Sequence, residues 1–118
     1  MSKPVGPYSP TYRAGGWLVV SGQIGIVDGA LVAADTLGQA RQALANLREL
    51  LEAEGVAMSA VVKTTLFLLD MGEFAAVNEV YAEAFGDHRP ARSTVSVTGL
   101  PLGARFEVEA WAWTGGGA

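Results

Sequence analysis

Residues 60–69 of the 118-residue chain read Ala-Val-Val-Lys-Thr-Thr-Leu-Phe-Leu-Leu, an apolar run rich in β-branched side chains. The run is too short for an ordinary helix and follows a helical segment that ends at a glycine, so it predicts a buried strand. Helical periodicity flanks it on both sides. The predicted order is therefore strand, short strand, helix, strand, helix, strand, strand, within a single domain that spans residues 1–118.

The two helical segments have recognisable beginnings. Thr36 followed by Gln39 has the form of a capping box, and the helix that they open is expected to end near Gly55. Asp70 is the expected cap of the second helix. Apolar side chains recur at steps of three and four, and we expect them to face the core: Leu37, Ala40, Leu44, Leu47 and Leu51 in the first helix, and Phe74, Val77, Tyr81 and Phe85 in the second.

The remaining strands are shorter, and the two ends of the chain are irregular. Residues 1–10 contain three prolines and predict an ordered arm without regular structure, whereas residues 114–118 predict a disordered tail. Strands are predicted at residues 17–22, 30–32, 92–97 and 105–113.

Two helices of this size can cover only one face of a mixed sheet of five or six strands. The fold class is therefore α+β with one uncovered sheet face. Half of the residues are hydrophobic and only 17% are charged, which is a small polar inventory for a chain of this length. Both observations predict self-association, with the uncovered face hidden in an oligomer.

Side-chain alternation places two charged residues on that uncovered face. In the last strand Phe106 and Val108 belong to an apolar row, while Glu107 belongs to the opposite row. In the preceding strand the row that contains Val95 is the more apolar one, and it leaves Arg92 opposite. If the apolar rows share the helix side, Arg92 and Glu107 share the uncovered face and could meet at a subunit boundary.

Composition excludes several classes of function. The net charge is −4, so direct nucleic-acid binding is disfavoured. The chain has no cysteine and a single histidine, His88, which rules out thiol chemistry and a Ser-His-Asp triad and gives no metal site. No apolar run approaches the roughly 20 residues of a membrane span and the first residues lack a signal-peptide core, so a cytoplasmic location is expected.

The chain resembles the RidA/YjgF family of reactive-intermediate deaminases through nearly its whole length. Many collinear segments carry the resemblance: Gly6-Pro7-Tyr8-Ser9, Ser21-Gly22-Gln23-Ile24, Asn46-Leu47, Val62-Lys63-Thr64-Thr65, residues 74–81, Pro90-Ala91-Arg92-Ser93, residues 100–104, and Glu107-Val108-Glu109. The resemblance implies a chorismate-mutase-like fold that assembles as a homotrimer, with sites in the clefts between subunits.

The resemblance also implies an activity, the hydrolysis of unstable 2-imino acids such as 2-iminopropanoate and 2-iminobutanoate to 2-oxo acids and ammonium. Arg92 would hold the substrate carboxylate, a task that suits its forked N–H donors, and Glu107 would position or activate the water. The same resemblance places three further residues in the pocket, namely Tyr8, Ser21 and Asn78. It implies neither a cofactor nor a metal.

At three positions the chain departs from well-characterised members of the family. Thr94 stands where cysteine is common and would be a small polar wall of the pocket, Pro10 stands where glutamine is common, and Gly25 replaces a usual proline.

Other interpretations of the same residues remain open. Arg92 could form a structural ion pair with Glu107 or Glu109, and Tyr8, Ser21 and Asn78 could each have purely structural roles. At the level of function, the alternatives are a metabolite-binding or holdase-like protein without turnover and, less favoured, an endoribonuclease or translation inhibitor.

Overall fold

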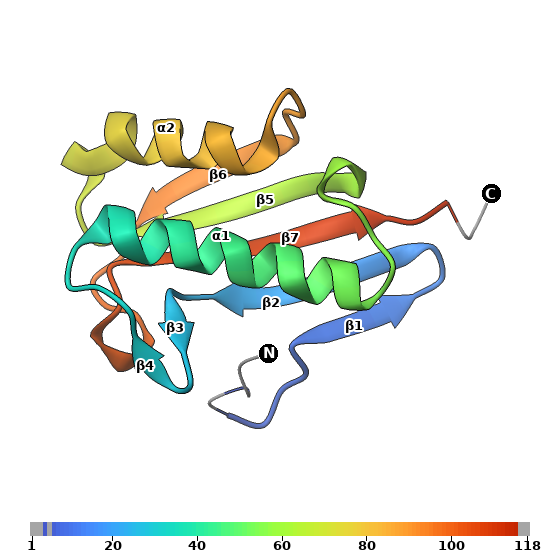
Figure 1. Ribbon diagram of the computed structural model, residues 1–118, viewed down its shortest axis with the longest axis horizontal. Helices are drawn as coiled ribbons and strands as arrows, with labels where there is room; N and C mark the ends of the chain where they lie inside the picture. The colour runs from blue at the N-terminus through green and yellow to red at the C-terminus, as the bar shows by residue number, and fades with distance from the viewer. Residues whose placement is uncertain (1–3, 5, 116–118) are drawn as a thin grey trace.

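The computed structural model describes residue 4 and residues 6–115. A five-stranded sheet in the order β1-β2-β7-β5-β6 lies behind two helices that cover the same face (Figure 1). The elements are β1 (Thr11–Ala14), β2 (Trp17–Gln23), β3 (Ile26–Val27), β4 (Ala30–Leu31), α1 (Thr36–Ala53), η1 (Met58–Ala60), β5 (Val61–Leu68), η2 (Met71–Glu73), α2 (Phe74–Phe85), β6 (Ala91–Ser96), η3 (Pro101–Gly103) and β7 (Phe106–Trp113).

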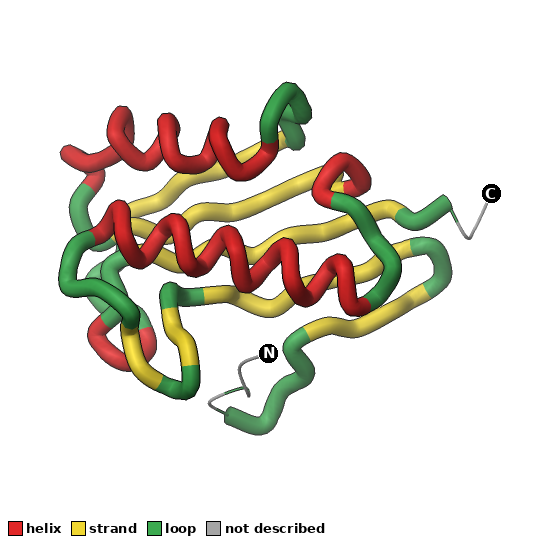
Figure 2. Tube along the Cα trace, viewed as in Figure 1, coloured by secondary structure: helices red, strands yellow, loops and turns green. Residues whose placement is uncertain are grey.

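The strand at residues 60–69 and the two helices around it form as predicted, except that Asp70 caps the short 3-10 helix η2 and not α2, which begins at Phe74. β5 is buried between β7, which runs antiparallel to it, and β6, which runs parallel to it. On the helix side, Leu66 of β5 packs with Phe106 and Val108 of β7, and all three side chains are fully buried. Figure 2 shows both helices lying across this sheet, with the predicted short strand as half of a separate β3-β4 pair. The α+β class and the mixed sheet with one covered face are therefore confirmed.

β1 is a strand that the sequence analysis missed. It joins β2 through a tight turn in which Gly15 has a φ of 58°, and Ala14 pairs with Trp17. Three of its four residues are exposed, because β1 is the edge strand of the sheet. Such a strand shows no apolar alternation, which was the signal used to predict strands.

The capping box predicted at Thr36 is wrong by one residue. Asp35 caps α1, and its carboxylate accepts a hydrogen bond from Gly38 N at 3.0 Å. Thr36 is already inside the helix, and its buried hydroxyl donates to Glu73 at 2.8 Å and accepts from Arg105 Nε at 2.9 Å. The helix ends as expected, with Gly55 at a φ of 74° immediately after the cap.

The predicted tail is partly held in place. Thr114 donates two hydrogen bonds to the carbonyl oxygen of Gly16, from its backbone N at 2.7 Å and from its hydroxyl at 2.9 Å. The first tail residue is therefore fixed to the β1-β2 turn. Residues 116–118 of the predicted tail, and residues 1–3 and 5 of the predicted arm, lie outside the described residues.

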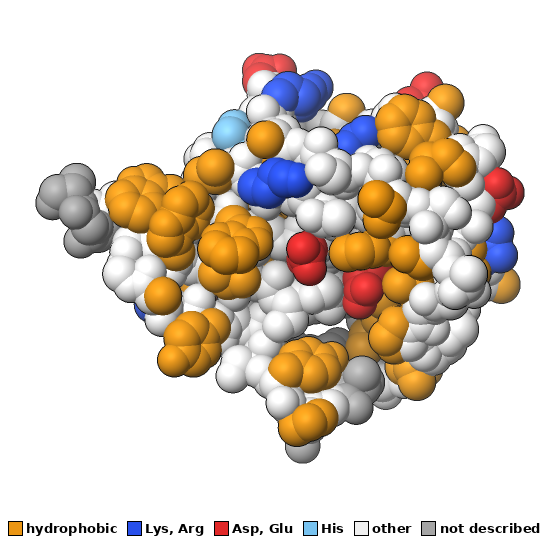
Figure 3. Space-filling view, turned by 180° about the vertical axis from the view of Figure 1, so that it is seen from behind, with side chains coloured by type: hydrophobic (Ala, Val, Ile, Leu, Met, Phe, Trp, Pro, Cys, Tyr) orange, Lys and Arg blue, Asp and Glu red, His pale blue; other side chains and the backbone are white. Residues whose placement is uncertain are grey.

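The face of the sheet opposite the helices exposes large apolar side chains (Figure 3). Trp111 and Trp113 of β7 are 45% and 39% exposed, and the Trp17 ring packs edge-on against both at centroid distances of 5.9 and 5.1 Å. Tyr12 and Val95 add to this surface from the two edge strands. Within the described residues, no helix is long and apolar enough to cross a membrane.

Candidate active site

Arg92 lies on the helix side of the sheet, not on the uncovered face. In the parallel register of β5 and β6 it is the partner of Thr64, which is fully buried and has its hydroxyl 2.7 Å from the Tyr81 hydroxyl of α2. The predicted alternation of β6 is therefore wrong. The reason is that β6 is an edge strand whose apolar Val95 is 42% exposed, so its more apolar row does not mark the core.

Three side chains of α2 hold the Arg92 guanidinium. Its Nη2 donates to Asn78 Oδ1 at 2.7 Å, and its Cζ lies 4.8 Å from the centroid of the Tyr81 ring and 5.4 Å from that of Phe74. These distances permit cation–π attraction on both rings. Burial raises the pKa of Tyr81, partly offset by the hydrogen bond to Thr64 and by the charge of Arg92. Phe74, which was expected in the core, is 39% exposed and forms an outer wall beside Arg92.

Arg92 does not form the structural ion pair that the sequence left open as an alternative, at least with any described residue. Among the described residues, the bond to Asn78 is its one hydrogen bond, and no carboxylate pairs with it. Most of its N–H donors therefore remain available to a bound acid. Two positions along the same side of β6, the hydroxyl oxygen of Thr94 is buried and has no hydrogen-bond partner within the described part of the chain. A buried hydroxyl without a partner is costly, and a bound molecule could supply one.

Glu107 lies on the opposite side of the sheet, where β7 faces away from the helices. Its neighbours Phe106 and Val108 are fully buried, whereas Glu107 is half-buried and faces Gly22 of β2. A Cβ atom on Gly22 would stand 2.5 Å from a Glu107 carboxylate oxygen, so only glycine leaves room for this carboxylate. Burial raises the pKa of Glu107, and the like charge of Glu109 raises it further.

Ser21 fastens the N-terminal arm to the strand that carries Gly22. Its hydroxyl donates to the carbonyl oxygen of Ser9 at 2.6 Å, and its backbone N donates to that of Pro10 at 2.9 Å. This contact gives the hydroxyl a structural role within the chain. Tyr8 lies on the same arm, directly before Ser9, and is 46% exposed.

Apart from Tyr8, which lies on the N-terminal arm, the predicted site residues thus form two groups that one chain does not bring together. The Arg92 group consists of Arg92, Asn78 and Thr94 with the rings of Tyr81 and Phe74, and the Glu107 group consists of Glu107, Gly22 and Ser21. The sheet separates the Arg92 and Glu107 side chains. Tyr81 and Phe74 are site residues that the sequence motifs did not indicate, although they lie three residues after and four before Asn78, on the same helix face.

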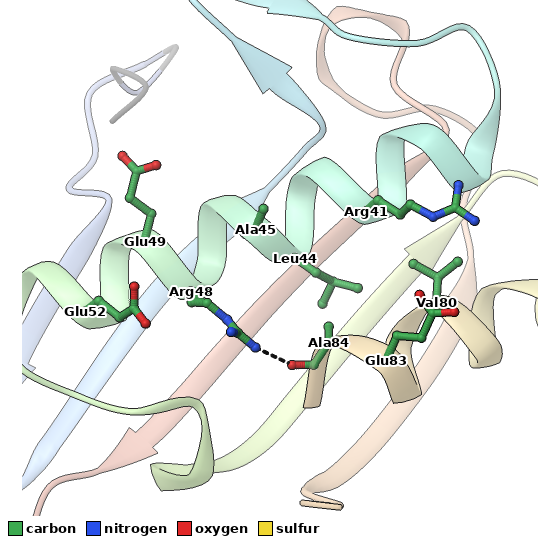
Figure 4. A pocket seen from close by; sticks show the side chains of 9 residues that line it. All are labelled: Arg41, Leu44, Ala45, Arg48, Glu49, Glu52, Val80, Glu83 and Ala84. Atoms are coloured by element: carbon green, nitrogen blue, oxygen red, sulfur yellow. Dashed lines mark hydrogen bonds between the residues drawn. The ribbon is translucent and has the colours of Figure 1, made fainter. Parts of the chain in front are cut away.

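A groove of about 480 Å³ also lies between the two helices on their outer side (Figure 4). Leu44 and Val80 line it together with charged residues, and Arg48 donates across it to the carbonyl oxygen of Ala84 at 2.7 Å. None of the predicted site residues lines this groove. No cluster of three or more metal-ligating His, Cys, Asp or Glu side chains occurs among the described residues.

Comparison with known proteins identifies the family. A family model described as Endoribonuclease L-PSP matches residues 1–114. A RutC family protein of Pyrococcus horikoshii is 46% identical over 113 residues, which cover 94% of this chain and 90% of that protein. The 2-iminobutanoate/2-iminopropanoate deaminase of Homo sapiens is 42% identical, with coverage of 94% and 82%. Escherichia coli TdcF with bound serine superposes with a TM-score of 0.87 at 36% identity, with coverage of 93% and 90%. The chain therefore belongs to the RidA/YjgF family, as its sequence motifs indicated.

Proposed function

We propose that this protein hydrolyses small 2-imino acids, such as 2-iminopropanoate and 2-iminobutanoate, to 2-oxo acids and ammonium. The observation that carries the proposal is Arg92, a half-buried arginine that α2 holds in place and that no carboxylate of the described chain neutralises. Such a group suits bidentate binding of a small carboxylate. The name of the human relative and the serine bound to TdcF agree with a ligand of this size and charge.

We further propose that a neighbouring copy completes the pocket in a homotrimer. Arg92 and Glu107 lie on opposite sides of one sheet, so a pocket that uses both needs the Glu107 group of a second chain. The exposed apolar surface around Trp111 and Trp113 supports such an assembly, because a patch of this kind marks an interaction surface.

The reaction asks little more than orientation and one proton shuttle. Arg92 would hold the carboxylate so that the adjacent imine carbon faces a water molecule beside Glu107. The water oxygen bonds to this carbon while the Glu107 carboxylate takes a water proton and passes it to the nitrogen. Glu107 then carries the hydroxyl proton of the resulting carbinolamine to the amino nitrogen, and the C–N bond breaks as the C=O bond forms. This leaves the 2-oxo acid and releases ammonia, which takes a proton from water to become ammonium. The raised pKa of Glu107 brings it closer to the working pH, as proton transfer requires.

An imine-trapping assay tests the proposal. A pyridoxal-phosphate dehydratase acting on serine or threonine would generate the imine in the presence of semicarbazide, which captures whatever imine has not been hydrolysed. We expect the purified protein to lower the semicarbazone yield and to speed the release of 2-oxo acid. Unchanged yields with both amino acids would contradict the proposed activity.

The RNA-cleaving activity named in the family model has no support from the charge of this chain. A net charge of −4 opposes approach to a phosphate backbone. We expect no salt-sensitive binding of a fluorescent single-stranded RNA at low ionic strength, and measurable binding would reopen this alternative.

The holdase alternative has a different test. If the protein suppressed the aggregation of an unfolding client and showed no turnover of imine, the holdase interpretation would be favoured.

Replacing Gly22 by alanine is expected to lower kcat about 100-fold while the protein stays folded. The new methyl group would occupy the position of the Glu107 carboxylate, which must then move, and a displacement of about 1 Å can cost a factor of this size. The obstructed atoms are the end of a flexible side chain, so the fold can adapt. Gly99→Ala is the matched control, because a Cβ there meets nothing within 4 Å. Equal rates for the two variants in the imine assay would contradict the prediction.

A further inference from the structure

The loop between β2 and β3 leaves the sheet and is held by α1. Asn46, which is 9% exposed, donates from Nδ2 to the carbonyl oxygens of Ile24 at 3.1 Å and of Ile26 at 2.9 Å. Gln42 orients this amide by donating to Asn46 Oδ1 at 2.9 Å. One side chain thus satisfies two carbonyl groups of the short segment that directly follows Gly22 and Gln23.

A second amide of α1 holds the beginning of β7. Gln39 is 1% exposed, and its Oε1 accepts a hydrogen bond from Arg105 N at 2.7 Å while its Nε2 donates to the carbonyl oxygen of Ala33 at 3.0 Å. Its backbone lies against Gly25, where a Cβ atom would stand 2.5 Å from the Gln39 carbonyl oxygen. α1 therefore touches both the loop after Gly22 and the residue two positions before Glu107.

These contacts hold the two backbone segments that lie on either side of the Glu107 carboxylate. Glu107 rests against Gly22, and its place depends on how the end of β2 and the start of β7 sit relative to each other. The register between these strands is irregular from Val20 to Gln23, so the ladder alone does not fix Gly22. We propose that Gln39 and Asn46 are positioning residues for Glu107, which fix the two backbone segments that enclose its carboxylate.

The inference rests on the proposed function. It predicts a lower kcat in variants that remain folded, which a role of Gln39 and Asn46 in core packing alone would not predict. The Arg92 group belongs to α2 and β6, so loosening the contacts of α1 leaves the carboxylate clamp intact. Loss of Gln39 or Asn46 should therefore lower kcat and leave KM nearly unchanged. A general loss of stability would lower the apparent kcat only by the fraction of unfolded protein, which a melting curve measures, so the comparison is made with variants that are folded at the assay temperature.

Two variants and a control test the proposal in the imine assay. Asn46→Asp keeps the shape of the side chain but cannot donate to Ile24 and Ile26, and Gln39→Met keeps its length but loses both polar contacts. We expect each to lower kcat at least 10-fold, with KM within about twofold of the wild-type value. Leu50→Ala removes a buried side chain of the same helix and should lower the melting temperature with kcat unchanged.

The pKa of Glu107, measured by NMR of its carboxyl carbon, gives a readout that does not depend on activity. Water reaching a loosened carboxylate should move the pKa of Glu107 towards its ordinary value in Asn46→Asp and Gln39→Met. The pKa should stay raised in Leu50→Ala. This readout stands even if the wild type proves inactive, which would count against the proposed function alone.

The result that overturns the proposal is a wild-type kcat and Glu107 pKa in folded Gln39→Met and Asn46→Asp, or a loss of kcat that Leu50→Ala shares at equal loss of stability. If neither main variant folds, Gln42→Leu removes only the bond that orients Asn46, and the same two readouts decide the proposal.

Discussion

Arg92→Ala is expected to lower kcat/KM for 2-iminopropanoate by about 100-fold to 10,000-fold. The change removes two charge-assisted hydrogen bonds to the substrate carboxylate, each worth about 1.5–3 kcal/mol. The rings of Phe74 and Tyr81 and the amide of Asn78 remain but cannot replace the positive charge. Initial rates in the imine assay measure the effect.

Arg92→Lys is the matched control for this prediction. Lysine retains the positive charge but loses the planar fork, so we expect it to lie between the wild type and Arg92→Ala. The melting temperature should change little in either variant, because Arg92 is only half-buried and makes no ion pair among the described residues. An Arg92→Ala protein with wild-type kcat/KM would show that another group binds the carboxylate.

Glu107→Gln is expected to lower kcat by about 100-fold to 10,000-fold, the usual range for loss of a general acid or base. Glutamine keeps the shape beside Gly22 but cannot take a proton from water. KM should change little, since the carboxylate clamp belongs to the Arg92 group. Unchanged kcat would leave Glu107 without a part in proton transfer.

The same variant has a pH-dependent effect on stability. Burial and Glu109 raise the pKa of Glu107 in the folded state, so as pH rises the unfolded chain gives up this proton first. Folding stability therefore falls as pH rises from the ordinary carboxyl pKa through the raised folded pKa, and then levels off. Glu107→Gln lacks this loss. We expect its melting temperature, relative to wild type, to increase across that pH window, and a constant difference would contradict the raised pKa.

The elements that sequence reasoning predicted well are long and strongly patterned. α1 and α2 have clear apolar faces, and β5 is an uninterrupted apolar run, so burial leaves one interpretation for each. The edges of the sheet gave no such signal. β1 is mostly exposed, and β6 carries polar Thr94 on its helix side and apolar Val95 on the other, because an edge strand is only partly covered on either face.

The candidate site shows the same division. Family motifs indicated Arg92, Asn78 and Glu107 as candidates. The alternation of β7 placed Glu107 on the correct sheet face, whereas that of β6 placed Arg92 on the wrong one. The roles of Phe74, Tyr81 and Gly22 depend on contacts between elements far apart in sequence. The cap at Thr36 failed for a related reason, since its hydroxyl bonds Glu73 and Arg105 instead.

Because the sheet separates Arg92 from Glu107, variants that are defective at one or the other residue should behave differently when they are mixed in one trimer. In the proposed trimer each chain supplies Arg92 to one pocket and Glu107 to another, so a chain that is defective at only one of these residues damages only one of its two pockets. Two chains that are faulty at different ends can still form one sound boundary between them. In a random mixture of equal amounts of the two forms, about a quarter of the pockets would be intact, so two inactive forms of the protein would complement each other.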